Sequence, residues 1–292
     1  MKVKLLNITN NVDQEEFEAG FLSENYEIET SAGKSITLPE CFSSYIRQDV
    51  VRDAVAASRA NRRQAYGHRR HLGRRRPQPG MKHSVEWWGK GRGVSRIMRK
   101  TGQRTGAENP HTRGGRRAHG PLVEKDWSQK VNSKVRRIAR NSAIAATCDS
   151  EMVSSRGHRF DDSVSFPIVI GDYVEARGKD KESYDVEQIP LANSTRKFIA
   201  MMQGIGLGAD LDRAKSGRKI RAGKGTMRGR KYRTPKSILL VVGQTDGLAK
   251  AARNVPGVDV VAAKDLCAED LAPGGDLGRL TVWTRQAIEA ME

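Results

Sequence analysis

The sequence predicts an α/β fold: a three-layer α/β/α domain with a mostly parallel sheet, plus a long extended basic loop inserted in it. In the C-terminal half, short apolar stretches alternate with helical patterns, which is typical of parallel strands joined by crossover helices. In the middle of the chain, residues 59–120 are strongly basic and nearly free of large apolar side chains. We therefore expect a globular domain formed by residues 1–66 and 121–292, and an arm formed by residues 67–120.

The first 66 residues predict a hairpin followed by a helix. Val3 and Leu5 alternate with polar residues, as do Tyr26 and Ile28 before a Ser-Ala-Gly-Lys turn, which indicates short strands in an edge hairpin over residues 1–38. Apolar residues then recur at helical spacing, which predicts a helix from residue 46 to about residue 66 that leads into the arm. These positions are Ile46, Val50, Val51, Ala54 and Val55.

After the arm, Asp126 can cap a helix over residues 127–155. One stripe of this helix carries Val131, Val135, Ile138, Ser142 and Ala145, and its other faces carry Lys130, Lys134, Arg136, Arg137 and Arg140. These cations form either an ordinary solvated face or an RNA contact, and the basic blocks elsewhere in the chain favour RNA.

The remaining elements are expected in regular alternation. The stretch SILLVVG at residues 237–243 has the continuous apolar character of a strand buried on both faces. We predict strands at 166–170, 237–243, 258–262 and 280–283, and helices at 195–203, 245–254, 264–271 and from 284 to the end. The charged residues 172–193 are expected to form a surface loop.

Positive charge is concentrated in two segments. The chain carries 52 Lys and Arg against 34 Asp and Glu, a net charge of +18. Residues 59–120 hold 18 bases and two acids, a net of +16, and residues 213–236 hold 11 bases and no acid. The rest of the chain is net acidic. Such segregation predicts a polyanionic partner, and nucleic acid is the one that fits best.

The arm cannot form a core of its own. Its only Leu, Ile, Val or Phe residues are Leu72, Val85, Val94 and Ile97, so we predict that it is disordered in the free protein and folds on its partner. A solvated linker is the alternative. Linkers seldom concentrate arginine in this way, or place Trp87 and Trp88 where their rings could stack on unpaired bases.

The candidate RNA-binding residues lie in the arm, its flanks and the second basic block. That block should form a loop or hairpin at a sheet edge, with a solvated loop as the alternative. Arginine suits these positions because its planar fork can bridge two phosphate oxygens. The candidates are Arg62, Arg63, Arg69, Arg70, Arg74, Arg75, Arg76, Trp87, Trp88, Arg96, Arg99, Arg104, Arg113, Arg116, Arg117, Arg137, Arg221, Lys224, Arg228, Arg230, Lys231 and Arg233.

Enzyme classes find little support. Cys41, Cys148 and Cys267 are far apart, and the histidines lack a ligand partner at zinc spacing, so we expect no metal. Residues 222–225 (AGKG) fail the phosphate-loop pattern at both ends, and GIGLG at 204–208 follows a predicted helix rather than a strand. The basic segments lack the clustered acids of a nuclease. We expect no catalysis, cofactor or small-molecule substrate. The sequence predicts neither a signal peptide nor a membrane span, so we expect a soluble cytoplasmic protein.

An ordered set of motifs gives a family resemblance that covers most of the chain. The chain resembles the universal large-subunit ribosomal protein L-four family, in its archaeal and eukaryotic branch. The motifs are LPECFSSYIRQDVV (38–51), WGKGRGVSRIMR (88–99), RGGRRAHGP (113–121), NSAIAAT (141–147), RGHRF (156–160), KIRAGKGTMRGRKYRTPKSILLV (219–241), AARNVPGVDVV (251–261) and LAPGGDLGRLTVWT (271–284).

The resemblance implies a structural protein of the large ribosomal subunit that binds ribosomal RNA (rRNA) and neighbouring ribosomal proteins. It further implies that the arm penetrates the rRNA and that its tip helps form the wall of the peptide exit tunnel, facing the nascent polypeptide. The tip residues would be Gly89, Lys90, Gly91 and Arg92. Residues 172–193 depart from the family pattern, and the chain lacks the long C-terminal extension of eukaryotic members. A free RNA-binding regulator or RNA chaperone is the alternative.

Overall fold

A seven-stranded sheet forms the centre of a unit that comprises Met1–Ser58 and Lys130–Glu292. A second unit comprises Arg59–Gln129. These assignments come from a computed structural model, which describes residues 1–12, 27–67, 80–177, 180–188, 194–245 and 247–291. Among the helices in these ranges, none combines the length and the apolar character needed to cross a membrane.

The sheet is mostly parallel, as predicted. Its strand order is β10-β9-β11-β5-β1-β2, and β6 pairs with β5. All pairings from β10 across to β1 are parallel, whereas β2 and β6 join antiparallel. The strands are β1 Lys2–Val12, β2 Glu27–Thr37, β5 Ile168–Arg177, β6 Asp180–Asp185, β9 Leu239–Val242, β10 Asp259–Ala262 and β11 Thr281–Thr284.

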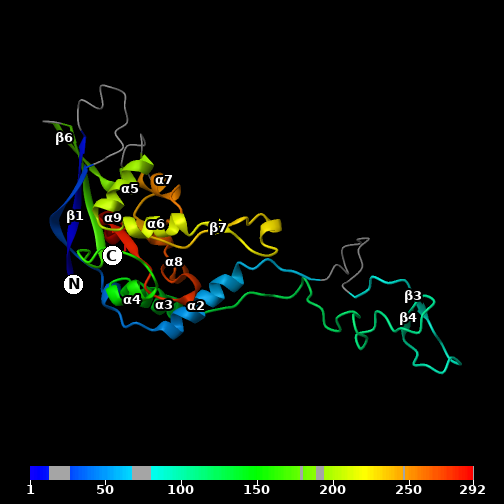
Figure 1. Cartoon of the computed structure of the whole chain (residues 1–292). Helices are drawn as coiled ribbons and strands as arrows, with labels where there is room; N and C mark the ends of the chain where they lie inside the picture. The colour runs from blue at the N-terminus through cyan, green and yellow to red at the C-terminus, as the bar shows by residue number, and fades with distance from the viewer. Residues whose placement is uncertain (13–26, 68–79, 178–179, 189–193, 246, 292) are drawn as a thin grey trace. The chain divides into compact units, whose positions relative to one another are not determined.

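Helices cover both faces of the sheet, which confirms the predicted three layers. Along β9, Leu240 and Val242 belong to one buried cluster, and Leu239 and Val241 belong to the other. The first cluster includes side chains of α5 (Ser194–Gly204), α6 (Gly208–Ser216) and α7 (Gly247–Arg253), which lie together in Figure 1. The second includes side chains of η1 (Glu40–Ser43), α2 (Gln48–Asn61), α3 (Ser133–Ala146), α8 (Ala268–Leu271) and α9 (Arg285–Glu289). Burial on both faces explains why residues 239–242 are apolar without interruption.

The N-terminal hairpin exists, but the predicted Ser-Ala-Gly-Lys turn was wrong. Strand β2 continues through residues 31–34 and pairs with β1 at the edge of the sheet. The register shifts between Lys4 and Leu6, where an irregularity absorbs one extra residue of β2. A side chain at Gly33 would clash there, because its Cβ would lie 2.7 Å from the Asn7 side-chain oxygen.

The helix expected over residues 127–155 is two shorter helices, α3 and α4 (Ser150–Ser155). Asp126 does not cap it, because its carboxylate accepts hydrogen bonds from the backbone and hydroxyl of Ser128. Helix α3 starts after Asn132, and Asp149 caps α4 through the backbone N–H of Glu151. The predicted stripe was also wrong at Ile138, which is 50% exposed.

Residues 172–193 are not simply a surface loop, contrary to expectation. Their described part contains the end of β5, the whole of β6 and the short helix η3 (Val186–Gln188). The first predicted helix also ends earlier than expected, at Asn61. In contrast, the predicted helix at 195–203 and the four predicted parallel strands match α5, β5, β9, β10 and β11 within a few residues at their starts.

Candidate RNA interface

The described tip of the arm is a small antiparallel hairpin. Strands β3 (Val85–Trp87) and β4 (Met98–Lys100) pair with Glu86 opposite Arg99. The loop between them contains Gly91 and Gly93, which have positive φ values of 88° and 63°. A Cβ at either glycine would meet no atom within 4 Å. The loop is therefore thin and open, and it exposes Lys90 and Arg92.

Two arginine side chains lie over the ring of Trp88. The guanidinium carbon of Arg92 lies 4.6 Å from the ring centroid, and that of Arg99 lies 5.6 Å from it. The indole N–H donates to the Glu86 carboxylate at 3.2 Å. Trp87, in contrast, is 65% exposed. The two tryptophans that the sequence offered together as base-stacking residues are thus in different situations, since only Trp87 presents a largely open ring.

Arg99 is turned into the arm. Its side chain is buried, and its guanidinium donates to the backbone oxygens of Arg104 and Ser95. The backbone closes over it, because Arg99 and Gly106 form an isolated β-bridge and the Ala107 N–H donates to the Met98 carbonyl at 2.8 Å. We conclude that Arg99 orders the hairpin, whereas the sequence had grouped it with the RNA-facing arginines.

The base of the arm has an aromatic cluster around Trp127. Tyr66 stacks on the Trp127 ring with a centroid distance of 5.3 Å. The Arg63 guanidinium and the Lys125 ammonium lie 4.6 and 4.5 Å from the same ring. The backbone N–H of Gln129 donates to the Asn61 side chain at 2.7 Å, which joins the two ends of the arm unit. These contacts hold the first and last residues of the arm unit together.

Close backbone packing fixes the middle of the arm at two glycines. A Cβ on Gly80 would lie 2.2 Å from the carbonyl oxygen of Gly115, and a Cβ on Gly115 would lie 1.9 Å from that of Asn109. Gly80 also has a positive φ of 91°. Only glycine permits this approach.

Most of the arm candidates that the structure describes are exposed. Arg116 is half-buried, and Arg99 and Trp88 are engaged as described above. The exposed candidates are Arg62, Arg63, Trp87, Arg96, Arg104, Arg113 and Arg117, together with the tip residues Gly89, Lys90, Gly91 and Arg92. Five candidates lie outside the described residues: Arg69, Arg70, Arg74, Arg75 and Arg76.

The second basic block forms a hairpin in the larger unit, as predicted. Strands β7 (Lys219–Ile220) and β8 (Tyr232–Arg233) pair, and the loop between them turns at Gly223 and Gly229, which have positive φ values. Arg221 donates to the Arg230 carbonyl, and the Thr226 hydroxyl donates to the Arg221 carbonyl at 2.7 Å. The other candidates on this hairpin are exposed: Lys224, Arg228, Arg230, Lys231 and Arg233.

Two hairpin features were missed by sequence reasoning. The Tyr232 ring, 47% exposed, has the Arg218 guanidinium 4.5 Å and the Lys231 ammonium 5.6 Å from its centroid. Met227, at the turn, is 80% exposed. The aromatic residue between Lys231 and Arg233 was the available signal, because an aromatic ring among cations suits contact with nucleic acid.

A buried polar cluster anchors the foot of this hairpin. Asp210 is fully buried, and its carboxylate accepts from Arg213 Nε at 2.8 Å and from the Ser237 hydroxyl at 2.5 Å, with His158 Nδ1 at 3.2 Å. Burial by itself raises the pKa of Asp210, but the hydrogen bonds from His158, Arg213 and Ser237 outweigh it and hold that pKa well below its ordinary value. Arg213 also donates to the Lys236 carbonyl at 2.7 Å, directly where the hairpin ends.

A second ion cluster adjoins the first through Ser237. The buried Arg279 donates to the Ser237 carbonyl at 3.2 Å and to the Asp259 carboxylate at 2.5 Å. Lys236 Nζ contacts the same carboxylate at 2.7 Å. Burial raises the pKa of Asp259, and these two cations lower it further than burial raises it. The residues that flank the basic hairpin, Arg213 before it and Lys236 after it, are therefore held by carboxylates within the fold.

Arg137 lies on the outer face of α3 beside other exposed cations. Lys134 and Arg136 share this exposure, whereas Arg140 is half-buried. The buried residues of α3 begin at Ala139, so its first turn and a half carries the charge and its C-terminal half packs in the core.

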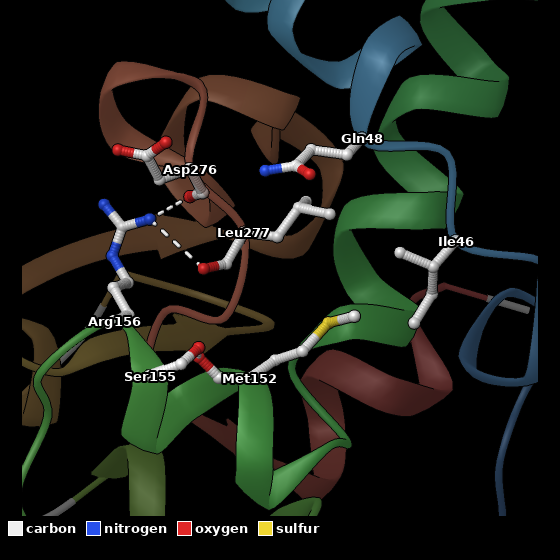
Figure 2. A pocket seen from close by; sticks show the side chains of 7 residues that line it. All are labelled: Ile46, Gln48, Met152, Ser155, Arg156, Asp276 and Leu277. Carbon is white, nitrogen blue, oxygen red and sulfur yellow. Dashed lines mark hydrogen bonds between the residues drawn. The ribbon is translucent and has the colours of Figure 1, made fainter.

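The larger unit contains a pocket of about 600 Å³, and the arginine that lines it is engaged in hydrogen bonds within the fold. It is lined by Ile46, Gln48, Met152, Ser155, Arg156, Asp276 and Leu277 (Figure 2). Arg156 donates to the carbonyls of Asp276, Leu277 and Pro273, so it holds residues 273–277 in place. Within the described ranges, no three His, Cys, Asp or Glu side chains are grouped so as to hold a metal ion.

Comparison with known proteins identifies the family. Residues 36–292 match the model of the Ribosomal protein L4/L1 family. Three relatives carry the name large ribosomal subunit protein uL4. The protein of Halobacterium salinarum is 44% identical over 87% of this chain and 92% of its own length. That of Methanopyrus kandleri is 43% identical over 91% and 96%, and that of Archaeoglobus fulgidus is 40% identical over 99% and 97%. These relatives give no support to the alternative of a free RNA-binding regulator or chaperone. The chain belongs to the ribosomal protein L4/L1 family.

Proposed function

We propose that this chain is a structural protein of the large ribosomal subunit that binds rRNA through two basic surfaces and takes no part in catalysis. The first surface is the arm, with its exposed arginines and Trp87. The second is the β7–β8 hairpin, with Lys224, Arg228, Arg230, Lys231 and Arg233. As a ribosomal component it would work in the cytoplasm, among neighbouring large-subunit proteins.

One observation carries the proposal: the hairpin presents its cations on a base that is anchored by ion pairs within the fold. No acid occurs between residues 213 and 236 to neutralise them. Instead, the acids that hold the hairpin, Asp210 and Asp259, lie at its foot and are already paired with Arg213, Lys236 and Arg279. The exposed cations keep their full charge for phosphate, and each contact formed would release counterions from the RNA.

We also propose that the tip residues Gly89, Lys90, Gly91 and Arg92 help form the wall of the peptide exit tunnel. This follows from the family resemblance and is supported by the open loop, in which nothing crowds Gly89, Gly91 or Gly93. A thin backbone with two projecting cations suits a narrow lining that a nascent polypeptide passes.

Sedimentation tests the main proposal. The chain should travel with large subunits through a sucrose gradient at high salt, and a variant with Lys224, Arg228 and Arg230 all changed to Ala should be incorporated less well. Release of the unchanged chain into the top fractions would contradict a structural role. For the tip, Lys90→Cys ribosomes should crosslink to a nascent chain that carries a thiol-reactive probe, whereas Lys264→Cys ribosomes should not.

A further inference from the structure

A buried carboxylate lies at the point in the sheet where open α/β proteins usually bind ligands. Strand β9 leads into α7, whose Leu248 and Ala251 belong to one core cluster, whereas β11 leads into α9, whose Ala287 and Ile288 belong to the other. The chain thus leaves two neighbouring strands toward opposite faces of the sheet. In open α/β folds, such a divergence marks the place at the carboxyl ends of the strands where ligands generally bind.

Glu187 fills this position. It is 2% exposed, and its carboxylate accepts from the backbone N–H of Gly243 at 2.6 Å and from that of Gln244 at 2.8 Å. The Thr284 hydroxyl donates to the same carboxylate at 2.5 Å. Three donors from the ends of β9 and β11 therefore converge on one buried oxyanion. Backbone amides gathered in this way form the usual cradle for phosphate and carboxylate groups.

The chain is built to keep this cradle close to Glu187. A Cβ on Gly243 would lie 2.9 Å from the Gln286 Cβ, so a side chain there would push α9 away. Thr284 also accepts from the Ala287 N–H at 3.1 Å, which fixes its hydroxyl group between the helix and the carboxylate. The side-chain amide of Gln286 also donates to the carboxylate of Asp185, at the end of β6, at 3.2 Å. The segment β6–η3 is thereby held against the carboxyl end of the sheet at two points.

We propose that Glu187 is an internal ligand: its carboxylate occupies an oxyanion site made by Gly243, Gln244 and Thr284, and it closes that site to small anionic ligands. This gives part of the segment 172–193 a role, because Glu187 belongs to that segment. The inference does not depend on RNA binding.

Removal of the carboxylate should leave a site that a free carboxylate can refill. In the full-length chain, Glu187→Ala leaves the N–H groups of Gly243 and Gln244 and the buried Thr284 hydroxyl without this acceptor, and it should lower the Tm by about 5 °C. Acetate at about 100 mM should restore at least half of this loss, because a ligand that binds only the folded state stabilises it by mass action. Sodium chloride at the same ionic strength should not.

The controls separate refilling from a general salt effect. Asp53→Ala removes an exposed carboxylate of α2, away from this site, and it should show no more response to acetate than the unchanged chain. Glu187→Gln keeps the shape and one acceptor oxygen, so it should be destabilised without gaining a response to acetate. An acetate response of Glu187→Ala no larger than that of Asp53→Ala would overturn the proposal.

A measurement on the unchanged chain decides the matter if Glu187→Ala does not fold. Amide hydrogen exchange should show the N–H groups of Gly243 and Gln244 protected to the level of β9, although both lie beyond the end of that strand. Exchange at unprotected rates would show that no stable oxyanion is bound there, and the proposal would fail. This result is independent of any RNA assay, so it distinguishes failure here from failure of the proposed ribosomal role.

Discussion

The guanidinium carbon of Arg92 lies 4.6 Å from the centroid of the Trp88 ring, and the adjacent Trp87 remains 65% exposed. The two tryptophans therefore differ in what they can offer to RNA. Trp88 supports a cation of the tip, while Trp87 has an open ring for a base.

Trp87→Ala should weaken binding to large-subunit rRNA more than Trp88→Ala does. Loss of a base stacked on Trp87 costs about 1–3 kcal/mol, roughly a fivefold or greater loss of affinity. Loss of the cation–π contact at Trp88 costs about 0.5–1 kcal/mol. Filter binding of both variants to purified rRNA measures the difference. Equal losses, or a larger loss for Trp88→Ala, would contradict the assignment.

The hairpin cations should act through charge alone. Changing Lys224, Arg228 and Arg230 to Ala should reduce the salt dependence of rRNA binding, with the slope of log affinity against log salt falling by about 2–3. The Tm should not change, because these side chains are exposed. Lys4→Ala, on an exposed position of β1, serves as the matched control and should leave the slope unchanged.

Deletion of residues 69–115 should leave the α/β domain folded. Both core clusters consist of side chains outside this segment, so the deletion removes no part of them. Calorimetry should show one cooperative transition, with binding to rRNA strongly reduced. Loss of the transition would mean that the arm contributes to the core after all.

Asp210→Asn should destabilise the chain most at neutral pH. The pKa of Asp210 in the folded state is held below its ordinary value of 3.8, so its ionised form stabilises the fold above that pH and loses this effect as the pH falls. Breaking such a buried network costs about 3 kcal/mol. Urea unfolding should therefore show a large deficit at pH 7 and a smaller one at pH 3.

A surface carboxylate provides the control for this experiment. The hydrogen bond from Arg47 lowers the pKa of Asp49 to about 2, but both side chains are exposed and solvent screens their interaction. Asp49→Asn should therefore leave the urea midpoint at pH 7 nearly unchanged. A deficit as large as that of Asp210→Asn would show that burial is not the decisive factor.

Patterns that depend on burial were readable from the sequence, while those that depend on single hydrogen bonds were not. The apolar run at 237–243 predicted β9 because both of its faces are covered. Asp126 is a residue type that often caps helices, yet its carboxylate accepts hydrogen bonds from Ser128, and the helix begins at Ser133. Nothing local distinguishes these two outcomes, since both satisfy the same carboxylate.

The candidate site was predictable in the same uneven way. The segregation of positive charge identified the arm and the hairpin, because a run of like charges without apolar neighbours cannot form part of a core. It could not separate Arg99, which closes a turn, from its exposed neighbours. Glu187 and Asp210 were not recognised either, because their partners are distant in sequence and a single acid in a mixed segment gives no pattern.

The strand order determines when the sheet can be completed during synthesis of the chain. Strand β11 lies between β9 and β5, and β5 in turn joins β1 to the rest. The sheet therefore remains split until residues 281–284 have been made, whereas the arginine-rich segment emerges well over a hundred residues earlier. During that interval the growing chain displays its polycationic part before the sheet is complete, so adventitious capture by any nearby polyanion is a hazard of this order of synthesis.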